Sequence, residues 1–430
     1  MVKKHLFVLL ACLFIVMIGF GITLPVLTFY VERLALAAGA SPRTIILHVT
    51  LLTSAYALMQ FIFAPIWGRL SDRIGRRKLI LMGISGYVAA QIMFGLSTSL
   101  WLLYAARIVG GILSSATLPA SAAYVVDMTT KEQRARGMAW LGTATSLGVI
   151  VGPALGGVLS RRDWHLTASL GHLKIDGFSI PFFVAALLGL LALPAAWRWL
   201  PESLSSTSGY AKKRSGLTAE QRKSGATLVR LLAPLLVMTM AGQLALSMFE
   251  ATFALFAQRK FAFGPVEVGY VFVVCGLVMT VMQAGAVGFL AGRISEIVQI
   301  GVGFAMMGVG ITLLATAQSM VTVIAFVALL STGMAFIAPN LSALVSKRGG
   351  PREAGSALGI QNSASSLGQS IGPVLGGALF IWQGNAPYLF GGAVLIALAI
   401  AVGWTVLAGG RNVALTKGDG LVSHSEGGTP

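Results

Sequence analysis

The sequence predicts an all-α membrane protein with twelve transmembrane helices arranged as two bundles of six. Of its 430 residues, 56% are hydrophobic and only 10% are charged, whereas soluble domains carry roughly 25% charged residues. The chain contains twelve apolar runs, and a bilayer span needs about 20 apolar residues. Because lipid cannot pair backbone polar groups, each run must be helical. The runs lie near residues 5–30, 46–70, 78–96, 100–126, 137–159, 181–199, 230–256, 267–291, 297–316, 320–345, 355–382 and 387–408.

The distribution of Lys and Arg predicts the orientation of the spans. The first run could be a signal peptide, but it is longer than the usual ~7–15 apolar residues and no clean cleavage site follows it, so we interpret it as a span. With the N-terminus inside, 23 of the 31 Lys and Arg fall on the inner side and seven on the outer side. This bias predicts cytoplasmic termini in the inner membrane of a bacterium. The net charge of +17 therefore reflects short loops at a lipid bilayer and no nucleic-acid partner.

Composition also divides the chain into domains. Residues 1–199 and 230–408 are the two predicted bundles, and the polar stretch 200–229 between them is typical of a flexible cytoplasmic linker. We expect the Gly-rich residues 409–430 to be a disordered cytoplasmic tail, and the long outer loop 160–180 to carry a short ordered element. The expected state is a monomer.

The two halves repeat each other at one offset. "GVIVGPALGG" at 148–157 matches "GQSIGPVLGG" at 368–377, an offset of 220 residues. The same offset aligns Pro119 with Pro339, and "WGRLSDR" at 67–73 with "VGFLAGR" at 287–293. Parallel repeats of six spans are typical of transporters that rock two halves about a site between them.

The inner loop between the second and third spans, "GRLSDRIGRRK", contains more than positive charge. Gly68 and Gly75 allow a tight turn, and Asp72 lies among cations that include Arg73 and Arg76. Cations alone would satisfy an inner loop, so the acid and the glycines favour a conformational latch. Gly292 replaces Asp72 in the second half, so the latch is asymmetric.

Asp127, at the inner end of the fourth span, is a second candidate part of the latch. Pairing with Arg73 or Arg134 would tie the loop to this span; the alternative is an interfacial charge or a helix cap.

A glycine motif marks the fifth span. Gly148, Gly152 and Gly156 recur every four residues and form a smooth face that another helix can approach closely. Pro153 removes one helical hydrogen bond and bends the span. Ordinary small-residue packing is the alternative to a role in gating.

The latch loop and the glycine motif resemble signatures of the major facilitator superfamily, the second of them typical of its antiporter branch. The stretch "YALMQFIFAPIWGRLSDRIGRRK", 56–78, is similar to tetracycline and multidrug efflux proteins. The resemblance covers the whole chain and implies proton-driven export of small molecules. Two departures weaken tetracycline as the substrate, because the acids that tetracycline pumps carry in the first and third spans are missing here.

Ionisable residues inside apolar runs are the candidates for proton coupling. A buried charge costs at least ~2.5 kcal/mol and is a functional candidate by default. Arg107 in the fourth span and Glu250 in the seventh lie at similar depths, about six residues (~9 Å) from the outer ends of their spans. Glu32 ends the first span on the same side. The resemblance implies that these three helices line the cavity and that an arginine in this part of the fourth helix takes part in proton coupling.

The alternatives for these three residues are snorkelling or structural pairing, and for Glu32 the structural reading is favoured. Val327 occupies the position that duplicates Arg107. We interpret Glu250 as the proton-coupling acid.

Polar and aromatic side chains on the central spans outline a candidate substrate pocket. Flexible and aromatic residues accept varied apolar ligands, although each alone is more often a packing residue. The candidates are Gln60, Gln243, Phe249, Phe253, Phe336, Asn340 and Gln361.

The function predicted is proton-coupled antiport of small amphipathic drugs, cationic or zwitterionic, with no cofactor beyond the proton gradient. The five histidines show no metal-ligand spacing, and Cys12 and Cys275 lie in apolar runs as packing residues. The alternatives are a sugar or amino-acid exporter of the same superfamily and a non-transporting receptor or scaffold. Nothing in the sequence resembles an enzyme site.

Overall fold

The computed structural model describes residues 2–130, 133–160, 168–170, 173–175, 177–203, 219–290 and 292–418. Within these residues twelve helices are long and apolar enough to cross a membrane. The prediction of an all-helical membrane protein with twelve spans is confirmed.

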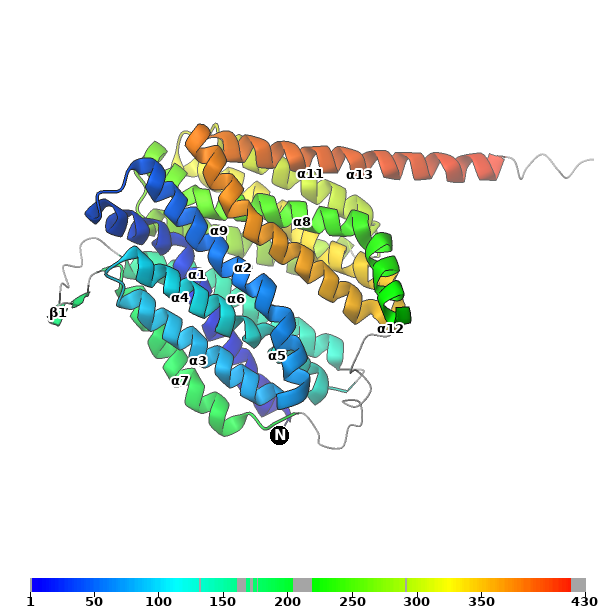
Figure 1. The fold of residues 1–430 in the computed structure, drawn as a ribbon. Coiled ribbons are helices and arrows are strands. Elements are labelled where there is room, and N and C mark those ends of the chain that lie inside the picture. The colour runs from blue at the N-terminus through cyan, green and yellow to red at the C-terminus, as the bar shows by residue number, and fades with distance from the viewer. Residues whose placement is uncertain are drawn as a thin grey trace, which may run out of the picture.

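The helices follow the predicted order. The first half contains α1 (Val2–Ala37), α2 (Pro42–Ile74), α3 (Arg76–Gly95), α4 (Leu100–Leu113), the 3₁₀ turn η1 (Ser114–Ala116), α5 (Thr117–Met128), α6 (Arg134–Leu159) and α7 (Ile180–Trp199). The second half contains α8 (Ala219–Phe261), α9 (Pro265–Met282), the π-helical turn η3 (Gln283–Val287), α10 (Gly288–Leu290), α11 (Glu296–Leu314), α12 (Met320–Trp382) and α13 (Ala386–Gly418). Figure 1 shows the two halves side by side, with the second half uppermost.

The fourth span is divided by a proline. Pro119 has no N–H, so the carbonyl of Ser115 four residues earlier lacks its α-helical donor. The chain tightens here into η1, and α4 and α5 continue on either side of it. This break lies about two turns beyond Arg107, which belongs to α4.

Helix ends differ from the sequence prediction in three places. The tenth and eleventh spans, Met320–Gly349 and Ser356–Trp382, belong to one element, α12, because the connection between them keeps helical backbone. The first helix of the second half begins at Ala219, so residues 219–229 belong to α8 and are not part of the linker. The last helix continues to Gly418, whereas the sequence analysis expected a tail without helix from residue 409.

The outer loop carries the ordered element that was expected. Strand β1 (Ala168–Leu170) pairs antiparallel with β2 (Leu173–Ile175), with Ala168 opposite Ile175. The remainder of the linker, residues 204–218, and the tail residues 419–430 lie outside the described residues.

Repeated glycines set the closest helix contacts within each half. A side chain on Gly152 of α6 would lie 2.5 Å from the Ile18 carbonyl oxygen and 2.6 Å from Gly21 Cα, both on α1. In the second half, a side chain on Gly372 of α12 would lie 2.6 Å from the Leu244 carbonyl oxygen on α8. The duplicated motif therefore has the same task in both halves, which is to let two backbones touch.

Among the described residues, the close contacts that glycines make between the two halves gather toward one end of the molecule. Near the β1–β2 pair, a side chain on Gly157 would lie 2.9 Å from the Pro265 carbonyl oxygen, and Thr50 Cγ2 lies 2.7 Å from the Cβ position of Gly377. At the opposite end, where the N-terminus lies (Figure 1), side chains at four glycines of the same four spans would meet no atom within 4 Å. These are Gly68, Gly142, Gly285 and Gly359. The structure is therefore open toward the end that carries the N-terminus.

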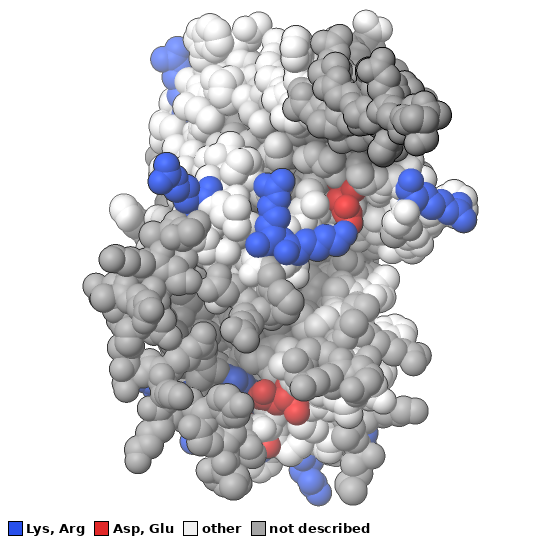
Figure 2. Space-filling view, turned by 90° about the vertical axis from the view of Figure 1, so that its right-hand side faces the viewer, with Lys and Arg blue, Asp and Glu red and all other residues white. Residues whose placement is uncertain are grey.

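Figure 2 looks onto this open end. Among the described residues of this face, blue Lys and Arg side chains predominate over red Asp and Glu side chains. The positive side of the molecule and its open side are thus the same.

Candidate functional site

Glu250 and Arg107 line one small cavity between the two halves. The cavity has a volume of about 30 Å³, which is room for roughly two water molecules. Its walls come from α1, α2 and α4 of the first half and from α8 and α12 of the second. The lining residues are Phe20, Thr23, Leu24, Thr53, Tyr56, Ala57, Arg107, Ser247, Glu250 and Gln369. The structure therefore brings together the two ionisable residues that the sequence singled out.

Arg107 is buried against aromatic rings. Its side chain is 7% exposed, and the guanidinium carbon lies 5.4 Å from the ring centres of both Tyr56 and Phe94. Arginine over a desolvated aromatic face gains about 2 kcal/mol. The buried Nε has no hydrogen-bond partner among the described residues. The rings thus hold the charged group in place while one of its donors stays available.

Glu250 is partly buried in the same cavity. Within the described part of the chain it has no hydrogen bond and no ion pair, including none with Arg107. A carboxyl group with no fixed partner, on a cavity wall between two halves, can exchange its proton when water enters. This arrangement suits an acid that is protonated and deprotonated in turn.

Glu32 does not belong to this cavity, and the prediction that all three ionisable groups converge is wrong for it. Its Oε2 accepts a 2.6 Å hydrogen bond from Gln258 Nε2, which joins α1 to α8 across the two halves. The physical reason is its position on α1, about two turns beyond Leu24 of the cavity and near the closed end. Glu32 therefore acts as a contact between halves in this conformation.

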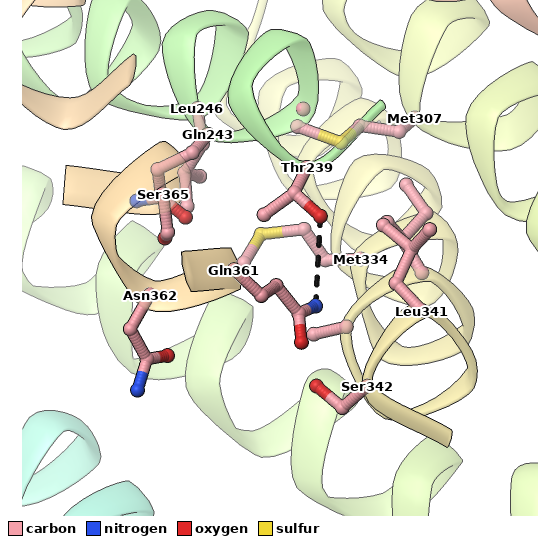
Figure 3. Close-up of a pocket in the computed structure, with 13 residues that line it drawn as sticks. Thr239, Gln243, Leu246, Met307, Met334, Leu341, Ser342, Gln361, Asn362 and Ser365 are labelled. Atoms are coloured by element: carbon pink, nitrogen blue, oxygen red, sulfur yellow. Dashed lines mark hydrogen bonds between the residues drawn. The ribbon is translucent and has the colours of Figure 1, made fainter. Parts of the chain in front are cut away.

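Some candidate substrate residues line a second, larger cavity. It has a volume of about 180 Å³ and lies wholly within the second half, between α8, α11 and α12. Gln243 and Gln361, two of the seven candidates, face it (Figure 3). The lining residues are Thr239, Gly242, Gln243, Leu246, Met307, Met334, Ile337, Ala338, Leu341, Ser342, Gln361, Asn362 and Ser365.

The aromatic candidates are buried in this conformation. Phe249 and Phe253 are at most 1% exposed, and their ring centres lie 6.0 and 5.8 Å from that of Phe272. Phe336 is 8% exposed and lines neither cavity. In this conformation Phe249 and Phe253 belong to the hydrophobic core of the second half, and the substrate-binding role of all three residues stays a prediction.

The two remaining polar candidates have protein partners. Asn340 Nδ2 donates to Gln299 Oε1 (3.1 Å) and to the Phe336 carbonyl oxygen (2.8 Å), so both of its donors are used within the protein in this conformation. Gln60 Nε2 lies 3.4 Å from the Tyr56 hydroxyl oxygen, which places it behind the Arg107 cavity.

The inner loop forms a polar cluster around the start of α3. Gly75 has a φ of 104°, which a residue with a side chain rarely adopts. Arg76 is buried, and its Nε donates to Asp127 Oδ2 at 3.1 Å. Asp127 therefore ties the loop to the fourth span through Arg76 and not through the exposed Arg73. The side chains of Asp72 and Arg134 lie outside the described ones.

Two residues of this cluster were missed by the sequence analysis. Glu202 Oε1 accepts the backbone N–H of Arg76 at 2.8 Å, and Ser203 Oγ donates to Asp127 Oδ2 at 3.0 Å. Both come directly after the sixth span, so the start of the linker caps α3. Their place in "LPES", the first polar residues after an apolar run, is the signal that could have indicated them.

The sequence analysis also missed Ser247 and Gln369 at the Glu250 cavity. Ser247 is three residues before Glu250, a spacing that puts both on one helix face. Gln369 lies within the duplicated glycine motif. These spacings are visible in the sequence, whereas the identity of the helix that faces them is not.

Two six-span halves that meet around a buried pair of ionisable residues, and that separate at one end, define the architecture of a secondary transporter. The sequence matches the Major Facilitator Superfamily over residues 9–373 and 299–420, and the chain belongs to this family.

Similar proteins align with this chain over most of their length. Multidrug resistance protein 2 of Bacillus subtilis is 29% identical over 94% of this chain and 95% of its own. The class B tetracycline resistance protein of Escherichia coli is 28% identical over 85% of this chain and 87% of its own. The human organic anion transporter MFSD10 has the same fold, with a TM-score of 0.68, 22% identity, and coverage of 93% and 99% of the two chains.

Proposed function

We propose that this protein is a proton-coupled antiporter that exports small amphipathic drug-like molecules from a bacterial cell. The relatives named for multidrug and tetracycline resistance, similar over most of their length, support the export of drugs. The basic, open end supports an orientation with both termini in the cytoplasm and the protein in the cytoplasmic membrane.

One observation carries the proposal of proton coupling. Glu250 and Arg107 line a single cavity at the junction of the halves, and neither has a fixed ionic partner among the described residues. Ionisable residues inside a membrane are retained where ions or protons move. An acid that served only packing would be expected to have a hydrogen-bond partner, because an unpaired buried polar group costs free energy.

The proposed cycle follows from the two ends of the molecule. In the conformation described here, cargo enters between the halves from the open end. Rocking of the halves then opens the opposite end, cargo leaves, and Glu250 takes up a proton from the outside. The protonated carrier returns and releases the proton inside. Each proton gains about 2.3 kcal/mol per 100 mV of membrane potential, in addition to the pH gradient.

The test is transport by Glu250→Gln, which keeps the shape of the side chain and removes its ionisation. In proteoliposomes with an imposed pH gradient, we expect the wild-type protein to move at least one of two drugs, the cation ethidium and the uncharged chloramphenicol, against its gradient. The variant should give only the level of protein-free vesicles with both drugs. Glu267→Gln is the matched control, because Glu267 is exposed at the start of α9 and accepts only the Gly264 N–H (2.8 Å). Wild-type pH-driven transport by Glu250→Gln would contradict the proposal.

A further inference from the structure

The larger cavity has a chemistry of its own. Its walls are aliphatic and thioether groups, with amides and hydroxyls at the margin, and none of its lining residues is charged. Met334 and Met307 project toward it from different helices, and Gln361 and Asn362 lie on the opposite wall (Figure 3). Ala338 and Asn362 are exposed, so the cavity is open to the outside of the protein at these residues.

The matching place in the first half is filled. At the offset of 220 residues, Thr239 corresponds to Gly19 and Met307 to Tyr87. A side chain on Gly19 would collide with the Tyr87 ring and the Gln91 amide, and the Tyr87 hydroxyl donates to the Ala185 carbonyl oxygen at 3.1 Å. The fold therefore does not require open space at these positions, because Tyr87 and Gln91 fill the space beside Gly19 in the other half.

Polar groups at the cavity are free to bind a ligand. Gln361 Nε2 makes only a long contact, 3.5 Å, to Thr239 Oγ1. In the described part of the chain, Gln243, Asn362 and Ser342 have no hydrogen-bond partner. Amides offer both donors and acceptors, so the site suits a molecule with carbonyl or hydroxyl groups beside an apolar ring.

The cavity is also distinct from the proton site. Glu250 lines the other cavity and is seven residues beyond Gln243 on α8, which corresponds to about 10 Å along the helix. A permanent cation in the larger cavity would lose its hydration without gaining a carboxylate partner, which is unfavourable in a site of low polarity.

We propose that this cavity of the second half is the cargo subsite and that it binds uncharged amphiphiles. One ring lies among Met307, Met334 and Leu246, and the polar groups of the ligand pair with Gln243 and Asn362. A cavity of about 150 Å³ holds benzene, so 180 Å³ accepts one substituted ring. The proposal rests on the proposed export function and narrows its cargo from the cationic class predicted from sequence to a neutral one.

The experiment is equilibrium binding to the purified full-length protein in lipid nanodiscs, with no gradient. The probes are chloramphenicol, an uncharged one-ring amide, and benzyltriethylammonium, a permanent one-ring cation. We expect chloramphenicol to bind more tightly than the cation. Met307→Tyr, which introduces the residue that fills the first half, and Ala338→Phe should each weaken chloramphenicol binding by roughly tenfold or more.

Ala401→Phe is the matched control, because Ala401 is an exposed residue of α13 away from the cavity, and it should bind like the wild type. Thermal unfolding identifies any variant that fails to fold. If one of Met307→Tyr and Ala338→Phe does not fold, the binding measured with the other variant decides the test. Two results would overturn the proposal: tighter binding of the cation, or unchanged chloramphenicol binding in folded Met307→Tyr and Ala338→Phe. Because no proton gradient is present, either result leaves the export function to the Glu250→Gln test.

Discussion

The contact between α6 and α1 predicts opposite effects for the same substitution at two positions of one helix. Gly152→Ala places a methyl carbon 2.5 Å from the Ile18 carbonyl oxygen and 2.6 Å from Gly21 Cα. Favourable contacts lie at about 3.5–4.0 Å, so the two helices must move apart by roughly 1 Å. Overpacking of this kind destabilises the folded protein by about 1–3 kcal/mol. The better helix propensity of Ala stabilises it by at most about 1 kcal/mol.

Gly142→Ala is the matched comparison, since a side chain at Gly142 of α6 would meet no atom within 4 Å. Only the helix propensity changes there, so the variant should be more stable by about 0.5–1 kcal/mol. The gain in helix propensity is common to both variants, so their stabilities should differ by the cost of overpacking, about 1–3 kcal/mol, with Gly152→Ala the less stable.

The measurement is thermal unfolding in detergent, followed with a dye that becomes fluorescent on reaction with thiols. Cys12 of α1 is 2% exposed and becomes reactive only when α1 separates from its neighbours. Domains of 150–250 residues shift by about 2–4 °C per kcal/mol, so the two midpoints should be several degrees apart. Equal midpoints, or a Gly152→Ala protein more stable than Gly142→Ala, would refute the reasoning about close backbone contact.

Two further predictions concern the ends of the molecule. Asp127→Asn should destabilise the protein by about 1–3 kcal/mol, because buried Arg76 loses a charged hydrogen-bond acceptor. Glu296→Gln is the control: it removes only the exposed pair with Lys347 and should change the same unfolding midpoint little. Equal effects of the two substitutions would argue against the latch. Cysteines at Ser54 and Ser370, where the Ser54 hydroxyl donates to the Ser370 carbonyl oxygen, should be joined by a short bifunctional thiol reagent in a background without the native cysteines. The link should stop drug transport in proteoliposomes, and transport that continues at the wild-type rate would show that the halves do not separate at this contact.

The spans and the ionisable pair could be predicted from the sequence because each depends on one chain segment. A long apolar run is a span wherever it packs, and a charge inside it is conspicuous. The similar depth of Arg107 and Glu250 followed from counting residues along two helices of known rise. The structure then places both at one cavity.

Residues whose role depends on a second helix could not be assigned in this way. Phe249 could equally line a pocket or fill a core, and only its contacts with Phe272 decide. Asn340 is paired by Gln299 of α11, a partner that its own helix does not reveal. In the latch, the left-handed Gly75 brings Arg76, and not Arg73, to Asp127. Sequence spacing gives the candidates, whereas the rotation of each helix selects among them.

The duplication shows where the two halves differ, and that difference bears on the coupling. At the offset of 220, Arg107 corresponds to Val327 and Glu250 to Tyr30. Val327 is fully buried, and the Tyr30 hydroxyl lies 3.0 Å from the Phe94 carbonyl oxygen and 2.8 Å from that of Ser97. Each half thus contributes one ionisable residue to the shared cavity. At the position that corresponds to the ionisable residue of the other half, each half has a neutral residue, Tyr30 or Val327.

We propose that this asymmetry links protonation to movement. If Arg107 and Glu250 belonged to the same half, rocking would leave their separation unchanged. Because they belong to different halves, rocking changes the distance between them, and their attraction varies inversely with that distance. The free energy of ionising the carboxyl then differs between the two conformations, which is the condition for a proton to favour one of them.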